Sequence, residues 1–294
     1  MTLTMNEAYP IQATGTDDYR FFVLPTNLPA DKYLSAIEFV PGNKRLVHHS
    51  RLMTDTTHQV RAIHGLSADD PAISSFEKYP PADPFLYGWV PGNFPLLFPE
   101  GTGKKIHRQS DIILNIHYAP TGAVSFDQSK VNLYFTDRPI EREVYSLSIT
   151  ESHITNPPFL IKAFTKPTFY STYGPLPASI SVIAVLPHMH YLGKYFKAYA
   201  LTPEGETIPL IRINDWDFRW QGNYQYSKLL YIPKGSTIHI EAKFDNTEEN
   251  KDNPNNPPID VTYGWNTTKE MLDMVIYFLL YKTGDEDLPA FRKG

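Results

Sequence analysis

Apolar and polar residues alternate along much of the chain, which is the pattern of strands that bury one face. The clearest example is 237–244, where Ile238, Ile240 and Phe244 alternate with polar residues. Clusters of proline, glycine and asparagine separate the alternating segments, at the spacing expected of sandwiches or barrels. Strands are therefore expected at 20–24, 35–40, 45–53, 111–118, 131–136, 143–149, 159–164, 179–189, 195–201, 207–213, 225–231, 237–244 and 272–281.

Helical periodicity is scarce, and a short helix is expected only over 68–78, while long polar loops are expected at 79–105 and 246–260. Composition favours the same all-β fold, because 26 of the 294 residues are proline and 14% are aromatic. The length is typical of two domains or of one large β domain. We expect two antiparallel β-sandwich domains, residues 1–148 and 149–294.

Charge and cysteine content exclude several classes of function. The net charge is −5, so neither nucleic acid nor an anionic membrane is an expected partner. No apolar run approaches the roughly 18 residues that span a bilayer, so no membrane insertion is expected. Cysteine is absent, which excludes disulfides, thiolate metal sites and a cysteine nucleophile. Residues 1–20 are polar and contain no signal-peptide core, so the protein stays inside the cell or a leader has been removed.

Ten histidines are the most informative feature. His188 and His190 end an apolar strand, and residues two apart on a strand share a face. Two neutral imidazoles on one face can bind Zn, Cu, Fe or Ni, although most such pairs are packed or exposed histidines. His48 and His49 are consecutive, so joint ligation requires a bulge or a strand end. His117 lies opposite an apolar face, where it is free to act or merely exposed.

Met271 is a candidate soft ligand. In the segment 271–280 it shares a face with Asp273, which is unusual for a core methionine, and a thioether favours Cu(I). Met274 is the rival, but it lies on the apolar face and lacks the preceding glutamate. Strand alternation favours Met271.

The order of these residues resembles the copper type II, ascorbate-dependent monooxygenases, the family of peptidylglycine α-hydroxylating monooxygenase and dopamine β-monooxygenase, and bacterial members most of all. The resemblance runs from about residue 19 to residue 281. Each motif is weak alone, but together and in order they are specific. The matching segments are PGNKRLVHH (41–49), WVPG (89–92), IHYAPTG (116–122), HYLGK (190–194), WDFRWQ (216–221) and Gly264 followed by Glu270-Met271.

The resemblance implies jelly-roll-like sandwiches with a cleft between them and two copper ions per chain. One copper would store electrons in the first domain, and the other would activate O₂ in the second. The implied reaction hydroxylates a C–H bond of a small organic substrate, with ascorbate or another external reductant supplying electrons. The implied ligands are His48, His49 and His117 for the first copper and His188, His190 and Met271 for the second. A periplasmic or secreted location is expected for such an enzyme.

Two departures from the peptide-amidating enzyme bear on substrate. That enzyme has an arginine two residues before the first histidine of its His-x-His, where this chain has Leu186. It has asparagine and tyrosine two and four residues after its methionine ligand, where this chain has Asp273 and Val275. Peptide amidation is therefore disfavoured. Asp273 could instead hold a cationic amine. The alternative is a structural role, in which Asp273 bonds a neighbouring backbone group or lysine.

Two other classes of function stay open. A copper-binding or electron-relay module would keep the metal sites but hydroxylate nothing, and it would tolerate loss of Met271. A purely structural interaction module would use none of the matched ligands, which makes it the weakest alternative.

Overall fold

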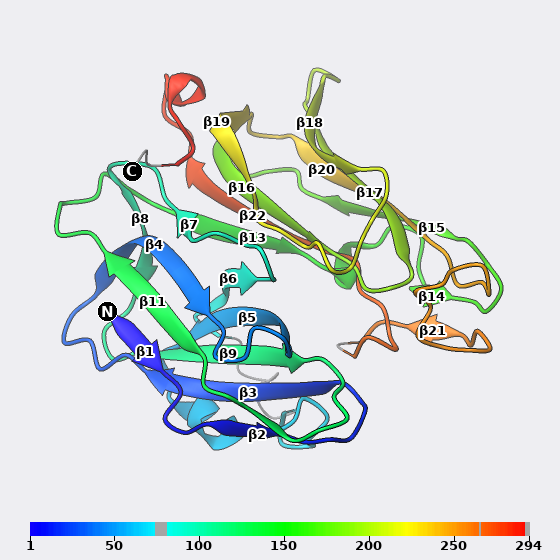
Figure 1. Cartoon of the computed structure of the whole chain (residues 1–294). Helices are drawn as coiled ribbons and strands as arrows, with labels where there is room; N and C mark the ends of the chain where they lie inside the picture. The colour runs from blue at the N-terminus through cyan, green and yellow to red at the C-terminus, as the bar shows by residue number, and fades with distance from the viewer. Residues whose placement is uncertain (74–80, 265, 292–294) are drawn as a thin grey trace. The chain divides into compact units, whose positions relative to one another are not determined.

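The computed structural model describes residues 1–73, 81–264 and 266–291, and the chain divides into two compact units. Unit 1 contains Met1–Ser146 together with Phe291, and unit 2 contains Leu147–Ala290. Sequence analysis places this division after residue 148. Both units are built almost entirely from antiparallel sheets (Figure 1), so the expected all-β fold is confirmed.

Unit 1 contains two main sheets. One has the order β1-β11-β4-β8-β12 with β7 beside β4, and the other has the order β3-β9-β5-β6; β2 and β10 form a separate pair. The strands and the 3-10 helix are β1 (Thr2–Thr4), β2 (Tyr9–Ile11), β3 (Asp18–Pro25), β4 (Lys32–Val40), β5 (Val47–Asp55), η1 (Gln59–Ile63), β6 (Asp83–Trp89), β7 (Leu96–Leu97), β8 (Thr102–Ile106), β9 (Asp111–Tyr118), β10 (Ser125–Asp127), β11 (Lys130–Phe135) and β12 (Arg142–Glu143).

β9 is the central strand of unit 1, and every one of its residues is buried. Ile112, Leu114 and Ile116 lie on one face of β9 and are fully buried. Ile113 lies on the opposite face of β9 and belongs to a second apolar cluster with residues of β3, β5 and η1. Because both faces of β9 are covered, the polar side chains on it lie in a protected environment.

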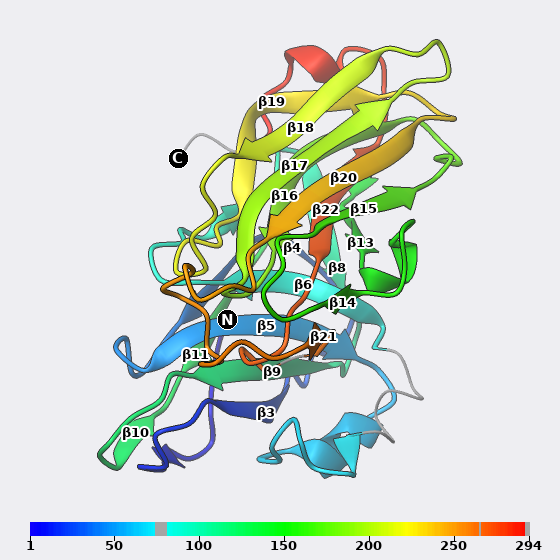
Figure 2. The same cartoon turned by 90° about the vertical axis from the view of Figure 1, so that its right-hand side faces the viewer.

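Unit 2 contains two four-stranded sheets, β13-β22-β16-β19 and β15-β20-β17-β18, of which the second faces the viewer in Figure 2; β14 and β21 form a separate pair. The elements are β13 (Tyr145–Ile149), which spans the division, η2 (Glu151–His153), β14 (Leu160–Ile161), β15 (Thr168–Tyr173), β16 (Ile180–His188), β17 (Gly193–Leu201), β18 (Thr207–Ile213), β19 (Tyr224–Ile232), β20 (Thr237–Phe244), β21 (Val261–Thr262), β22 (Asp273–Leu280) and η3 (Asp285–Asp287).

One apolar cluster forms the core of unit 2 and draws on both of its main sheets. β20 contributes Ile238, Ile240, Ala242 and Phe244, which are the apolar positions of its alternating pattern. Burial of apolar side chains from two facing sheets is the main stabilising contribution in a β-sandwich.

The expectation of a loop over 79–105 is wrong, because β6, β7 and most of β8 lie in this segment. β6 is an edge strand, where Pro84 and Gly88 are tolerated although they disguise the alternating pattern. β8 contains Lys104, whose ammonium is buried and pairs with Asp83 at 2.9 Å. Because a charged residue occupies this buried position, the alternating apolar pattern of a strand is not visible there.

Two further expected elements differ from the structure, and one of them lies partly outside the described residues. The strand expected over 159–164 is reduced to Leu160–Ile161, and Phe164 at φ 61° ends the extended conformation. Residues 68–72 of the helix expected over 68–78 form turns and a bend, while 74–78 lie outside the described residues.

Candidate metal centres

A β-bulge brings His48 and His49 toward the same point. The register of β5 against β9 shifts between Val47, which pairs with Tyr118, and His49, which pairs with His117. The extra residue in the bulged strand is His48, so the two consecutive histidines escape strict alternation. The structure therefore contains the bulge that joint ligation by these two histidines requires.

The Nδ1 atoms of three histidines converge in unit 1. His48 Nδ1 lies 3.2 Å from His49 Nδ1, and His117 Nδ1 lies 3.4 Å from His49 Nδ1. Ligand atoms bound about 2.0 Å from one metal ion, at angles between tetrahedral and trigonal, lie about 3.3–3.5 Å apart. Two of the three spacings in this three-histidine site (His48, His49 and His117) therefore match a single metal ion, and all three ligand atoms lie within 4.8 Å of one another.

Asp17 and Tyr19 hold the His117 ring. Asp17 Oδ1 lies 2.7 Å from His117 Nε2, and the Tyr19 ring stacks on the imidazole with centroids 4.1 Å apart and planes 5° apart. A carboxylate only accepts hydrogen bonds, so the proton lies on Nε2 and Nδ1 keeps its lone pair for a metal. Burial lowers the pKa of His117 while Asp17 opposes the shift, so the imidazole is neutral near neutral pH.

Asp17 should control metal affinity at the three-histidine site. We expect Asp17→Asn to raise the dissociation constant of this site for copper by about 10- to 100-fold, because the carboxylate that accepts from His117 Nε2–H orients the ring and raises its basicity. A competition titration with a chelator measures the effect. Asp137→Asn, an exposed residue of the same unit, is the matched control. Equal affinities in the two variants would contradict the assigned role.

His188 and His190 lie side by side at the end of β16 in unit 2. β16 ends at His188, so His190 lies just beyond the regular strand. Their ring centroids are 5.1 Å apart and their planes are nearly perpendicular, at 85°. Met189 between them is fully buried in the apolar cluster of unit 2. The two imidazoles thus lie on one side of the chain, and the Met189 side chain lies on the other.

Carbonyl oxygens set the tautomer of both rings. His188 Nδ1 hydrogen-bonds Gln221 Oε1, and the Gln221 amide donates to Phe218 O at 2.5 Å, which fixes the orientation of the amide. His190 Nδ1 donates to Lys269 O at 3.1 Å. Because both acceptors require a proton on Nδ1, each ring keeps its lone pair on Nε2, the nitrogen available to a metal.

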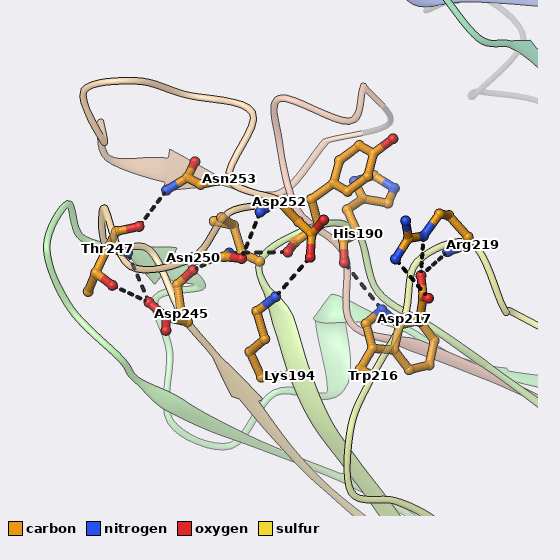
Figure 3. Close-up of polar contacts among 12 residues, drawn as sticks. His190, Lys194, Trp216, Asp217, Arg219, Asp245, Thr247, Asn250, Asp252 and Asn253 are labelled. Atoms are coloured by element: carbon orange, nitrogen blue, oxygen red, sulfur yellow. Dashed lines mark hydrogen bonds and ion pairs between the residues drawn. The ribbon is translucent and has the colours of Figure 1, made fainter.

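Glu270 connects the strand end that carries the histidines to the segment that carries Met271. Its carboxylate accepts from the backbone N–H groups of His190, of Leu192 at 3.0 Å and of Met271 at 2.9 Å. Complete burial raises the pKa of Glu270 to about 8, although these backbone donors favour the charged form. Trp216 also holds this turn, since its Nε1 donates to His190 O at 3.2 Å (Figure 3).

Met271 lies two residues before β22 rather than within a strand, and its side chain is buried. The Glu270 carboxylate accepts from the backbone N–H groups of both Met271 and His190. This shared acceptor links the two candidate ligands. The rival Met274 is fully buried in the apolar cluster of unit 2. Core packing accounts for Met274.

The two candidate substrate residues lie on the same face as His188. Asp273 pairs directly with His188 across β22 and β16, and Leu186 is two residues before His188. Residues directly opposite in antiparallel strands, and residues two apart in one strand, share a face. Leu186 is buried and Asp273 is half-buried. The expected placement of both beside the histidines agrees with this register.

Four residues with supporting roles were not assigned from the sequence. Gln221 and Glu270 lie within motifs that carry the family resemblance, which is a signal for them, whereas Asp17 and Tyr19 lie outside those motifs. Tyr19 depends on the register of β3 against β9, in which it pairs with His117. Pairing of distant strands cannot be read from alternation alone.

The comparison with known sequences and solved structures gives no information on function. The sequence matches no protein-family model and no curated protein. The major capsid protein P2 of bacteriophage PM2 shares 8% identity over 97% of this chain and 99% of that one, with a TM-score of 0.29. The VP2 subviral particle of infectious bursal disease virus shares 10% identity over 99% and 73%, with a TM-score of 0.24. A Paenibacillus xanthan lyase shares 11% identity over 96% and 25%, with a TM-score of 0.22. Likeness at this level carries no argument about family, ligand or reaction.

A membrane-spanning helix is not found in the part of the chain that the structure describes, since none there is both long and apolar enough.

Glu270 should contribute to folding of unit 2. We expect Glu270→Ala to lower the free energy of unfolding of the metal-free protein by about 1–3 kcal/mol, because the buried backbone N–H groups of His190, Leu192 and Met271 lose their acceptor. Urea unfolding followed by tryptophan fluorescence measures the change. Glu248→Ala, at an exposed residue of the same unit, should leave stability unchanged. Equal stability of the two variants would refute this contribution.

Proposed function

We propose that this protein is a copper-dependent monooxygenase that hydroxylates a C–H bond of a small organic substrate with O₂ and an external reductant such as ascorbate. The observation that carries the proposal is the contrast between the two histidine sites. His48, His49 and His117 converge through Nδ1, whereas Gln221 and Lys269 leave Nε2 of His188 and His190 as the lone-pair nitrogens.

The donor sets suit copper in two different roles. Three imidazoles suit an ion that alternates between Cu(II) and Cu(I), so the three-histidine site would hold the electron-storing copper. His188, His190 and Met271 would hold the second copper, because a thioether biases a site toward Cu(I). Copper supplies the electron transfer and the O₂ activation when bound. The chain's residues orient the ligands through Asp17, Gln221 and Glu270.

The overall reaction balances with two electrons from the reductant. Substrate C–H, O₂, two electrons and two protons give C–OH and water. An external donor is needed for these two electrons, because the chain contains no cysteine and so no dithiol that could be oxidised to a disulfide. Such a donor and the family resemblance favour a periplasmic or secreted location.

Asp273 and Leu186 bear on the substrate. Leu186 offers no charge to pair with a carboxylate, which disfavours a peptide with a free C-terminus as substrate. Asp273 lies opposite His188 in the β-sheet register, so its carboxylate would attract a cationic amine to the face of the second site. A small organic amine is therefore the favoured substrate class.

Copper stoichiometry and turnover test the proposal together. After anaerobic Cu(I) loading and desalting, we expect two copper ions per wild-type chain, and one per chain in both His48→Ala and His188→Ala. We expect His188→Ala to abolish ascorbate-driven O₂ consumption that is coupled to hydroxylated product, because O₂ activation needs the second site.

Each outcome separates the proposal from its rivals. Two copper ions without hydroxylation of any amine or other C–H substrate would favour a copper-binding or electron-relay module. One copper ion or none in wild type would refute the two-site enzyme.

A further inference from the structure

Asn115 is a buried amide beside the three-histidine site. It lies on β9 two residues before His117, so the two side chains share a face at a rise of about 6.6 Å. Asn115 is 3% exposed, and its Nδ2 has no hydrogen-bond acceptor in the described part of the protein. A buried amide without an acceptor costs free energy, so this position calls for an explanation.

Three neighbours of Asn115 on this face cannot accept a hydrogen bond from its side-chain amide. Across the sheet Asn115 pairs with Phe21 on β3 and Arg51 on β5. On its own strand, the residue before it on the same face is Ile113. The Phe21 and Ile113 side chains carry no acceptor, and a guanidinium has only donors. The Arg51 guanidinium donates to Pro84 O through Nε at 3.1 Å and a terminal nitrogen at 2.7 Å.

His117 is the next residue on this face of β9. Its Nε2–H donates to Asp17, and its Nδ1 lone pair is directed toward His49 and the point where a metal would lie. The ring therefore has no acceptor to spare for Asn115. An atom bound at the three-histidine site would supply an acceptor that the described residues do not.

We propose that Asn115 Nδ2 donates a hydrogen bond to a solvent oxygen or a small anion bound to the metal of the three-histidine site. Asn115 is then a positioning residue for a fourth, exogenous ligand. Three imidazoles leave such a position in a four-coordinate ion, and a charged acceptor strengthens the hydrogen bond. This inference rests on the proposed function, since it requires a metal ion at His48, His49 and His117.

Azide binding to the Cu(II)-loaded protein tests the assignment. The parent is His188→Ala, which retains the three-histidine site, and azide is titrated by its charge-transfer absorption. We expect Asn115→Leu in this parent to raise the dissociation constant for azide about tenfold, the loss of one hydrogen bond to a charged group. Copper content should remain one ion per chain.

Ser50→Ala is the matched control. The Ser50 hydroxyl is also buried and lacks a partner in the described residues, and it is adjacent to His49 in the chain. It pairs with Ile116 and Trp89, so it lies on the opposite face of the sheet from His117. Its removal should not change the affinity for azide.

Stability of the metal-free protein is the second readout. We expect the unfolding temperature of Asn115→Leu without metal to equal or exceed that of the parent, because leucine removes an unsatisfied donor at similar volume. A structural role for the amide would instead lower it and would overturn the inference.

Failure of this inference is distinguishable from failure of the proposed function. Unchanged azide affinity in Asn115→Leu, or no azide binding to the copper-loaded parent, overturns the role of Asn115 and leaves the copper site intact. Absence of copper from the parent overturns both.

Discussion

The register of β3, β9 and β5 is the constraint on which the three-histidine site depends. It places Tyr19, His117 and His49 in one row across three strands, and the bulge in β5 adds His48 to that row. A shift of one residue in either pairing would turn these side chains to the opposite face. The apolar face of β9 prevents such a shift, because Ile112, Leu114 and Ile116 would then leave the core.

Unit 2 arranges its candidate ligands by a different means. His188 and His190 lie at a strand end, and the turn after them depends on buried polar groups rather than on cross-strand register. Glu270 binds the backbone of this turn and of Met271, while Gln221 and the carbonyl of Lys269 set the two tautomers. A satisfied polar network of this kind rigidifies a site, and losing one member leaves buried donors without acceptors. In the three-histidine site, strand pairing sets the positions of the three residues, while Asp17 and Tyr19 hold the His117 ring.

The sequence predicted much of the fold and most of the candidate ligands. Alternation placed 111–118, 207–213 and 237–244 with the bounds of β9, β18 and β20. It failed at β6 and β8, where an edge-strand proline and a buried Lys104–Asp83 pair mask the pattern. The consecutive histidines indicated that joint ligation needs a bulge or a strand end, and the structure has a bulge at His48.

The supporting residues could not be derived in the same way. Asp17 and His117 are 100 residues apart in the chain, and their contact depends on a pairing that local pattern does not encode. Asn115 has no distinguishing motif, and its lack of an acceptor is visible only in three dimensions. The histidine pattern and the family resemblance therefore indicate candidate metal ligands more readily than the residues that would orient them.

The central claim is that two chemically different copper sites exist, of which one contains the thioether of Met271. X-ray absorption of the protein loaded with two Cu(I) ions tests this most directly, because sulfur and nitrogen scatter at different distances. The account predicts a sulfur contribution that disappears in Met271→Leu and persists in Met274→Leu. A spectrum with only nitrogen scattering in wild type, or a sulfur signal that survives in Met271→Leu, would contradict it.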